Sequence, residues 1–503
     1  MSTPMHARET SRPDIKRIAT RGALWVTLTS AAALPLGYYR SWILGRFGDD
    51  GTVVGNYAII LLFIQIVVTF VLFGGPSVVT NFLPKIERKQ DKFAFILAYG
   101  LISITLSGVF IATINTFPTL VTALIQKPVD EATLRLLSLI APVVVLAQMA
   151  IYSLAGLMEF RMSSLLGQVQ LFAICLFSTL ASLFFSQGMV AHSIPMLAAV
   201  AGAANLFVFA AGGWYLLRQL PRSGLRCFLP PNFWRFSSFV HCNSIATFAY
   251  QSIDQLLILG ALGTSELGTY FILLQCAQLI TFVPQRIGQV MLASFSHMVG
   301  GGDSDELCRA YSKLCRAILV MSTPITLFLI LFSYPIASMF GGWCGERHLY
   351  LLALATAIHA GALGSVNSML IMAKERTGLF LANSLLLIGV QLAVTLWLLS
   401  RWGAYAVIAG KAAAIVSGQT GLFSIVRWRL DTVRLSPPAE FWVGMAVVFA
   451  CALLATMRAP LPLPLAALVF LLSSFTFLAT IGFRPSEIRA ILRKRKSPAG
   501  RAV

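Results

Sequence analysis

The chain has 503 residues, of which 57% are hydrophobic and only 11% are charged, and its formal net charge is +19. A mean hydropathy of +0.80 excludes an ordinary soluble protein, because a soluble core of this length could not bury so much apolar surface. The surplus of cations does not indicate a nucleic-acid partner, since the basic tail after Phe483 is typical of a cytoplasmic flank near anionic lipid. The eight cysteines show no metal-ligand spacing, so we expect reduced packing residues and no metal site.

Apolar stretches long enough to cross a bilayer recur along the whole chain. About 17 to 25 such residues make enough helix to cover roughly 30 Å of hydrocarbon. Fourteen transmembrane helices are predicted, at residues 22–45, 52–83, 93–114, 133–158, 163–187, 194–217, 236–260, 266–296, 316–340, 349–372, 378–400, 404–426, 440–457 and 462–483. The expected fold class is therefore an all-α polytopic membrane protein.

The positions of Lys and Arg predict the orientation, because short cytoplasmic loops retain these residues. An even number of spans places both termini on one side of the membrane. The segments on that side hold 29 of the 38 Lys and Arg residues, whereas the opposite loops hold only five. We therefore expect both termini in the cytoplasm, with the net charge mostly a consequence of topology.

Sequence motifs of common enzymes are missing: the chain has no GxSxG, no HExxH and no glycine-rich phosphate loop with its lysine. We therefore expect no enzyme and no bound cofactor. Two acidic pairs are predicted outside, Asp49 with Asp50 and Asp130 with Glu131. The first pair lies where some membrane glycosyltransferases keep a catalytic acid, although Asp-Asp-Gly is also typical of a solvated turn. The longest outer loop, about residues 115–132, is short for a polysaccharide polymerase or ligase.

An internal repeat relates the first two predicted spans to the seventh and eighth. Residues 43–48 (ILGRFG) precede GNY at 55–57, and residues 258–263 (ILGALG) precede GTY at 268–270. Both copies follow the pattern I-L-G-x-[FL]-G, a short polar turn and then G-x-Y, and the second turn is two residues shorter. Such a repeat predicts two six-helix lobes in parallel orientation, as in transporters built from two similar halves.

These features resemble the polysaccharide transporter branch of the multidrug/oligosaccharidyl-lipid/polysaccharide (MOP) exporter superfamily, the Wzx-type flippases. The resemblance rests on the two repeat motifs, the Gly-Gly-Pro sequence at 74–76 and the layout of six, six and two spans. It covers about residues 15–430, and the last two spans match an extension found in some members. It implies a V-shaped pair of lobes around a cavity that opens alternately inward and outward. The implied cargo is an undecaprenyl-diphosphate-linked oligosaccharide, moved from the inner to the outer leaflet.

The expected domain organisation follows from the repeat and from this resemblance. It consists of a cytoplasmic tail (1–21), an N-lobe of six spans (22–217), a cytoplasmic linker (218–235), a C-lobe of six spans (236–426), two further spans (440–483) and a basic cytoplasmic tail (484–503). The resemblance also places the protein in the inner (cytoplasmic) membrane of a bacterium.

Few ionisable side chains fall inside the predicted spans, and each is costly there unless it faces a cavity or a partner. Arg40, Arg286 and Lys411 are the candidates for substrate contact, because a cationic cavity suits a diphosphate or an acidic sugar. Snorkelling to the outer interface is the alternative, and it applies least to Arg286, which lies far from both ends of its span. Asp254 is the clearest buried acid, either as a gating partner of Arg40 or as part of a structural ion pair.

His241 and His359 are candidates for gating or coupling, since histidine can relay protons near neutral pH. The coupling ion would be H⁺ or Na⁺. A lone histidine in a transmembrane helix is, however, more often a packing residue. Gly74, Gly75 and Pro76 form the predicted hinge, because glycine and proline interrupt helices and let them bend as the lobes move.

The sequence thus predicts a flippase for lipid-linked oligosaccharide repeat units in an O-antigen, capsule or exopolysaccharide pathway. The expected partners are that lipid-linked oligosaccharide, membrane lipids and, in the pathway, a polysaccharide polymerase and export proteins. A cation-coupled drug or metabolite antiporter of the same superfamily is the main alternative, although a cation exporter needs buried acids and this chain offers essentially one. A membrane polysaccharide polymerase or ligase is the second alternative.

Overall fold

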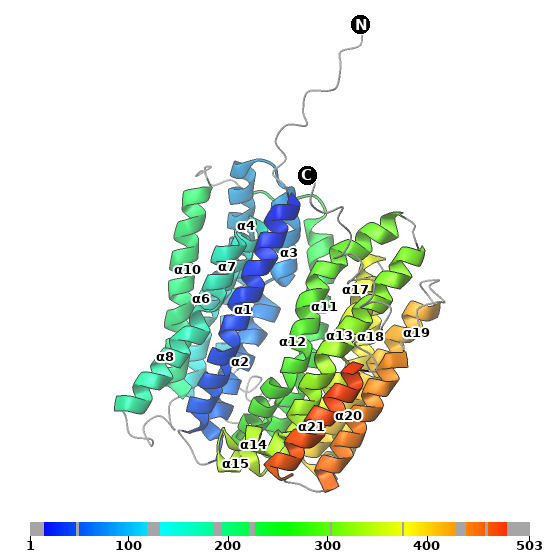
Figure 1. Cartoon of the computed structure of the whole chain (residues 1–503). Coiled ribbons are helices and arrows are strands. Elements are labelled where there is room, and N and C mark those ends of the chain that lie inside the picture. The colour runs from blue at the N-terminus through cyan, green and yellow to red at the C-terminus, as the bar shows by residue number, and fades with distance from the viewer. Residues whose placement is uncertain are drawn as a thin grey trace, which may run out of the picture. The chain divides into compact units, whose positions relative to one another are not determined.

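The structure is a computed structural model, and it describes residues 15–46, 50–117, 131–184, 194–220, 227–301, 304–374, 377–428, 439–457 and 461–479. Within these residues every regular element is a helix (Figure 1). Eleven helices in this described part of the chain are long and apolar enough to cross a membrane, and the apolar helix at Leu463–Phe477 is shorter. The predicted class, an all-α polytopic membrane protein, is confirmed, and the count of fourteen spans stays a prediction.

The chain divides into two compact units, Met1–Gly268 and Thr269–Val503. The first unit contains α1 (Ile15–Gly45), α2 (Thr52–Val71), α3 (Gly75–Phe82), the 3₁₀ turn η1 (Leu83–Lys85), α4 (Lys89–Thr116), α6 (Glu131–Gly156), α7 (Phe160–Gly167), α8 (Val169–Phe184), α10 (Ile194–Gln219), α11 (Phe233–Leu262) and the start of α12 (Thr264–Gly301). The second contains the rest of α12, α13 (Ser304–Leu331), α14 (Ser333–Ser338), α15 (Gly342–Gly345), α16 (His348–Ala360), α17 (Gly364–Ala373), α18 (Thr377–Trp402), α19 (Ala404–Trp428), α20 (Ala439–Met457) and α21 (Leu463–Phe477).

The second predicted span consists of two helices, α2 and α3, because its backbone changes direction at two glycines. Gly74 and Gly75 adopt left-handed backbone, with φ of 77° and 59°, which residues with a Cβ rarely take. Pro76 stands in the first turn of α3, where its missing N–H has no helical acceptor to lose. A Cβ on Gly74 would also lie 3.1 Å from the carbonyl oxygen of Ser237, so this break allows α11 to approach closely.

Helix α11 packs against α2 and α3 inside the first unit. Aromatic rings fill the contact at one end, with Phe82 of α3, Phe95 and Tyr99 of α4, and Phe233 of α11 at centroid distances of 6.0 to 6.3 Å. Rings at such distances contact each other in offset or edge-to-face arrangements. They fix the start of α11 against the elbow between α3 and α4. The sequence assigns α11 to the second lobe, and the predicted lobe boundaries stay a prediction.

The second unit is organised around α13, which packs against α16, α20 and α21. Phe441 of α20 and Phe477 of α21 are buried in one cluster with Tyr311 of α13 and Leu363. The two predicted spans beyond the lobes are therefore part of the core of this unit. Helices α18 and α19 form a close pair in which a Cβ on Gly410 would collide with the Thr395 hydroxyl, as expected where small residues bring helices together in a membrane.

Candidate functional site

Arg40 lies in α1 and is buried in the first unit, where it is only 6% exposed. Nη1 donates a hydrogen bond to the Tyr57 hydroxyl at 3.0 Å, and the guanidinium carbon lies 4.7 Å from the centre of the Tyr57 ring. Nη2 donates to Ser41 Oγ at 3.5 Å. Tyr57 is the tyrosine of the first G-x-Y motif, so the repeat motif supplies the surface on which the cation rests.

The Arg40 guanidinium retains unused hydrogen-bonding capacity. Nε is buried without an acceptor, and the described partners of the side chain, Tyr57 and Ser41, are both uncharged. A buried cation in a membrane is costly unless a counter-charge compensates it. This arrangement therefore favours an anionic ligand, to which guanidinium can donate two parallel hydrogen bonds.

The other two predicted cations lie elsewhere in the chain. Lys411 is 8% exposed in α19, in the second unit. Arg286 lies in α12, and its side chain is outside the described residues. A single substrate site formed by the three cations stays a prediction.

Asp254 is fully buried in α11, with 0% of its surface exposed. Its Oδ1 accepts a hydrogen bond from the backbone N–H of Gln255 at 3.0 Å. Near it on the same helix, Ser252 Oγ donates to Gln65 Oε1 of α2 at 3.4 Å, which ties α11 to α2. Because the described hydrogen bonds of Arg40 go to other residues, the predicted gate between Arg40 and Asp254 stays a prediction.

The break between α2 and α3 is held by side chains from two other helices. The Gly74 N–H donates to His241 Nδ1 of α11 at 3.4 Å, and the His241 ring lies 5.0 Å from the Phe73 ring. The Tyr99 hydroxyl of α4 donates to the Phe73 carbonyl at 2.9 Å, with the Gly75 carbonyl at 3.4 Å. Backbone groups freed inside a membrane need such partners. His241 thus contacts the predicted hinge, and it accepts through an unprotonated nitrogen.

His359 is buried in α16, with 0% of its surface exposed. Its Nδ1 lies 3.1 Å from Thr326 Oγ1, and the Thr326 hydroxyl donates to the Ser322 carbonyl at 2.8 Å. Since a hydroxyl carries one proton, His359 Nδ1 must be the donor to Thr326. Nε2 is then an acceptor, and it has no partner among the described residues. The predicted coupling role of His359 stays a prediction.

The starts of α2 and α12 meet through four residues that we call the glycine clasp: Gly51, Gly55, Thr264 and Gly268. A Cβ on Gly55 would collide with the Thr264 carbonyl, and a Cβ on Gly268 would collide with the Gly51 carbonyl. The repeat aligns Gly51 with Thr264 and Gly55 with Gly268, so each copy makes the same contact with the other. A glycine at the same place in both copies was a sequence signal for this contact, but the repeat alone does not reveal that the two glycines meet.

Asp50 holds the turn before α2 through its carboxylate. Oδ2 accepts a hydrogen bond from the Thr52 hydroxyl at 2.6 Å and Oδ1 accepts one from the Thr52 N–H at 3.0 Å, and these bonds lower the pKa of the carboxyl. The Asp50 carbonyl accepts a hydrogen bond from the Ser265 hydroxyl beside the glycine clasp. A carboxylate stabilised in its ionised form is a poor general acid, which favours the turn role over catalysis. Asp49 and Asp130 lie outside the described residues.

A family model described as "Polysaccharide biosynthesis protein" matches residues 54–345, which is more than half of the chain. The chain belongs to this family. The match begins in α2 and ends in α15, so it includes Gly55, Thr264 and Gly268 of the glycine clasp but not Gly51. No curated protein matches the sequence.

Solved structures share the fold of this chain at low sequence identity. The lipid II flippase MurJ in an inward closed conformation has a TM-score of 0.69 and 13% identity, covering 91% of this chain and 98% of MurJ. An inward-facing multidrug resistance MATE transporter of the MOP superfamily has a TM-score of 0.62 and 12% identity, covering 80% and 95%. A MOP superfamily transporter from Pyrococcus furiosus, described as having a binding pocket of reverse polarity, has a TM-score of 0.55 and 12% identity. The match covers 84% of this chain and 98% of that transporter. The fold is thus shared with transporters described as members of the MOP superfamily, as the resemblance in the sequence predicts.

Proposed function

We propose that this membrane protein is a flippase that moves undecaprenyl-diphosphate-linked oligosaccharide repeat units from the inner to the outer leaflet. The observation that carries the proposal is Arg40, a buried guanidinium whose described partners are uncharged. A diphosphate would supply the missing counter-charge and would occupy the free N–H groups. The description of the family as a polysaccharide biosynthesis protein supports a saccharide cargo.

Alternating access would open and close the glycine clasp, which we propose as the outer gate. Apart from the Thr264 side chain, its contact consists of backbone and of glycines, and a hydrogen bond from Ser265 to the Asp50 carbonyl lies beside it. Helices that meet through glycines pack closely but bury little side-chain surface. Separating them therefore exposes few apolar atoms, which suits a contact that must form and break in every cycle.

The proposed location is the inner membrane of a bacterium, with both termini in the cytoplasm. The one-sided distribution of Lys and Arg along the chain supports this orientation. In that setting a polysaccharide polymerase and export proteins would act on the flipped repeat unit to form O-antigen, capsule or exopolysaccharide.

A cation-coupled antiporter is the second candidate function. Two groups of the described chain favour it: Asp254 is a fully buried acid, and His359 presents an unpartnered, accepting Nε2. Both features suit binding of a proton or a cation inside a membrane protein. The fold does not separate the two candidates, since MurJ and MATE transporters share it.

The test is lipid analysis of a strain that lacks the protein. We expect a complete lipid-linked repeat unit to accumulate on the cytoplasmic leaflet while surface polysaccharide disappears. Complementation with Arg40→Lys should restore part of the export and Arg40→Ala should restore none, because the charge matters more than its geometry for a diphosphate. Arg46→Ala is the matched control, since Arg46 follows the last residue of the same helix and is exposed. Its guanidinium carbon lies 4.2 Å from the centre of the Trp42 ring. Normal surface polysaccharide with altered sensitivity to a cationic compound would favour the antiporter.

A further inference from the structure

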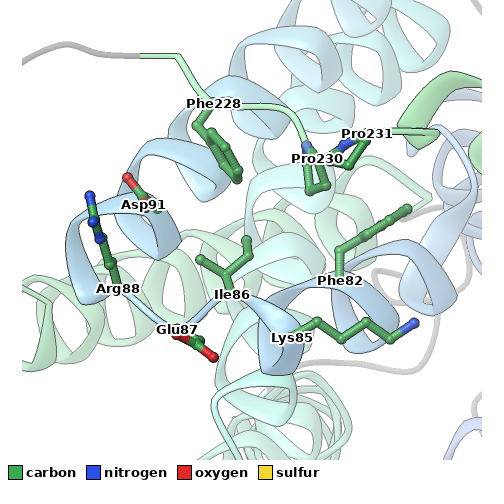
Figure 2. A pocket seen from close by; sticks show the side chains of 9 residues that line it. All are labelled: Phe82, Lys85, Ile86, Glu87, Arg88, Asp91, Phe228, Pro230 and Pro231. Atoms are coloured by element: carbon green, nitrogen blue, oxygen red, sulfur yellow. The ribbon is translucent and has the colours of Figure 1, made fainter. Parts of the chain in front are cut away.

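A pocket of about 450 Å³ lies at the elbow between α3 and α4, outside the site described above. One wall is the turn that joins these helices, and the other is the extended segment that leads into α11 and carries Phe228 (Figure 2). Both segments are predicted on the cytoplasmic side by their position in the topology. The helix α4 that starts at this turn is one of the candidate membrane spans. The pocket therefore lies at the level where lipid headgroups meet water.

The charged groups that line the pocket carry both signs. Arg88, Glu87 and Asp91 line it, with Asp91 on the same side of Ile86 as Phe228 and Glu87 on the other side (Figure 2). None of the three forms an ion pair or a side-chain hydrogen bond within the described part of the chain. The remaining cation, Lys85, instead donates to Asn81 Oδ1 at 2.8 Å. The lining is therefore balanced in charge, although the chain as a whole carries +19. An anion such as inorganic phosphate would be repelled by the two carboxylates, whereas a zwitterion could satisfy both signs at once.

The floor of the pocket is apolar. Phe82 and Ile86 are each 9% exposed, and the Phe228 ring points toward Ile86 from the opposite wall (Figure 2). A small soluble zwitterion would leave this floor uncovered, while the glycerol and first acyl carbons of a phospholipid would bury it. A ligand with two charges at one end and an apolar body at the other fits both halves of the pocket.

We propose that this pocket binds the headgroup of a zwitterionic phospholipid of the phosphatidylethanolamine type. The phosphate lies against Arg88, the ammonium group lies against Asp91, and the glycerol backbone contacts Ile86 and Phe228. The lipid is a bound component of the first unit and not the transported cargo, so this assignment does not depend on the proposed flippase activity.

The experiment titrates detergent-purified full-length protein with phosphatidylethanolamine or with phosphatidylglycerol of the same acyl chains, and counts bound lipid by native mass spectrometry. Phosphatidylethanolamine should be retained preferentially. Arg88→Gln and Asp91→Asn should each weaken its retention about tenfold, the effect of losing one hydrogen bond to a charged group. Lys89→Gln, an exposed neighbour outside the lining, should retain the lipid as the wild type does.

Equal retention of phosphatidylglycerol would overturn the assignment, because that headgroup lacks the ammonium group. Unchanged retention in both Arg88→Gln and Asp91→Asn would overturn it too, and would identify these side chains as solvated surface charges. All variants change exposed or half-exposed residues, and thermal unfolding of each shows that the fold is retained. Lipid export in cells is measured separately, so a failed flippase assay leaves this result unaffected.

Discussion

The two copies of the repeat begin alike and then diverge. Helices α2 and α12 both start at the glycine clasp, yet α2 ends at Val71 and α3 begins three residues after Leu72, whereas α12 runs unbroken from Thr264 to Gly301. The sequence TFV occurs in both copies, at 69–71 and at 281–283. It is followed by LFGGP in the first copy and by PQRIG in the second. Two glycines with positive φ break a helix here, and an internal proline does not.

The divergence shows that a helix inside a membrane ends where other side chains take over its backbone groups. The break after α2 has such partners in His241 and Tyr99. In the alignment through TFV, the second copy has Arg286 in the place of Gly74. One copy thus uses this position for a break, and the other places there one of the cations predicted to meet the substrate.

The largest effect is expected where the two copies agree. Gly268→Val would force a side chain against the Gly51 carbonyl, at a cost of about 1–3 kcal/mol for overpacking, so the glycine clasp could not close and export should be lost. Surface polysaccharide and membrane abundance are the measurements. Gly108→Val is the control, because a Cβ on Gly108 in α4 meets nothing within 4 Å. Similar export by the two variants would contradict the gate.

The break between α2 and α3, which the second copy lacks, should depend more on Gly74 than on Gly75. Gly74→Ala should lower the free energy of unfolding by about 2–4 kcal/mol, because it combines left-handed backbone with a collision against Val78 and Ser237. Gly75→Ala should cost only about 1 kcal/mol, since the nearest atom to its Cβ would be Ser244 Oγ at 3.9 Å. Thermal unfolding in detergent measures both. Equal losses would mean that close packing against α11 does not matter.

Tyr99→Phe tests the partners of the break. Loss of the hydroxyl leaves the Phe73 carbonyl without its 2.9 Å donor, and we expect destabilisation of about 1 kcal/mol. Tyr39→Phe is the matched control, because its hydroxyl pairs with Thr179 at an exposed site. If both variants unfold at the same temperature, the break does not depend on Tyr99.

The smallest effect concerns the turn, where the first copy carries Asp50. In the folded protein the pKa of Asp50 lies below its ordinary value of 3.8. The stabilisation by the ionised carboxylate is therefore complete above pH 3.8, and it is lost as the pH falls through the pKa that Asp50 has in the folded protein. Thermal unfolding of the wild type between about pH 5 and pH 2 should include this loss. The Asp50→Asn variant should lack this pH-dependent loss of stability. Identical pH profiles of the variant and the wild type would show that the Asp50 carboxylate does not stabilise the turn.

Much of the fold could be predicted from the sequence, because apolar length and charge bias are local properties. The predicted fourth span, 133–158, corresponds to the part of α6, Arg135–Gly156, that is long and apolar enough to cross a membrane. The break inside the second span was visible only as a Gly-Gly-Pro sequence, since positive φ is a property of folded backbone. Contacts such as Gly74 with His241 join residues 167 positions apart. Periodicity in one sequence does not encode such pairings. The contact of Arg40 with Tyr57 is also a tertiary contact that the sequence pattern does not predict.

The glycine clasp has the form of a two-fold dimer interface contained in one chain. In such an interface a residue i contacts j of the partner while j contacts i, and Gly55 with Thr264 and Gly268 with Gly51 satisfy this rule under the repeat alignment. A chain of one lobe could therefore have used this surface to bind a second copy of itself. Fusion of two such chains would keep the contact and free the copies to diverge, one toward a broken helix and the other toward a buried arginine.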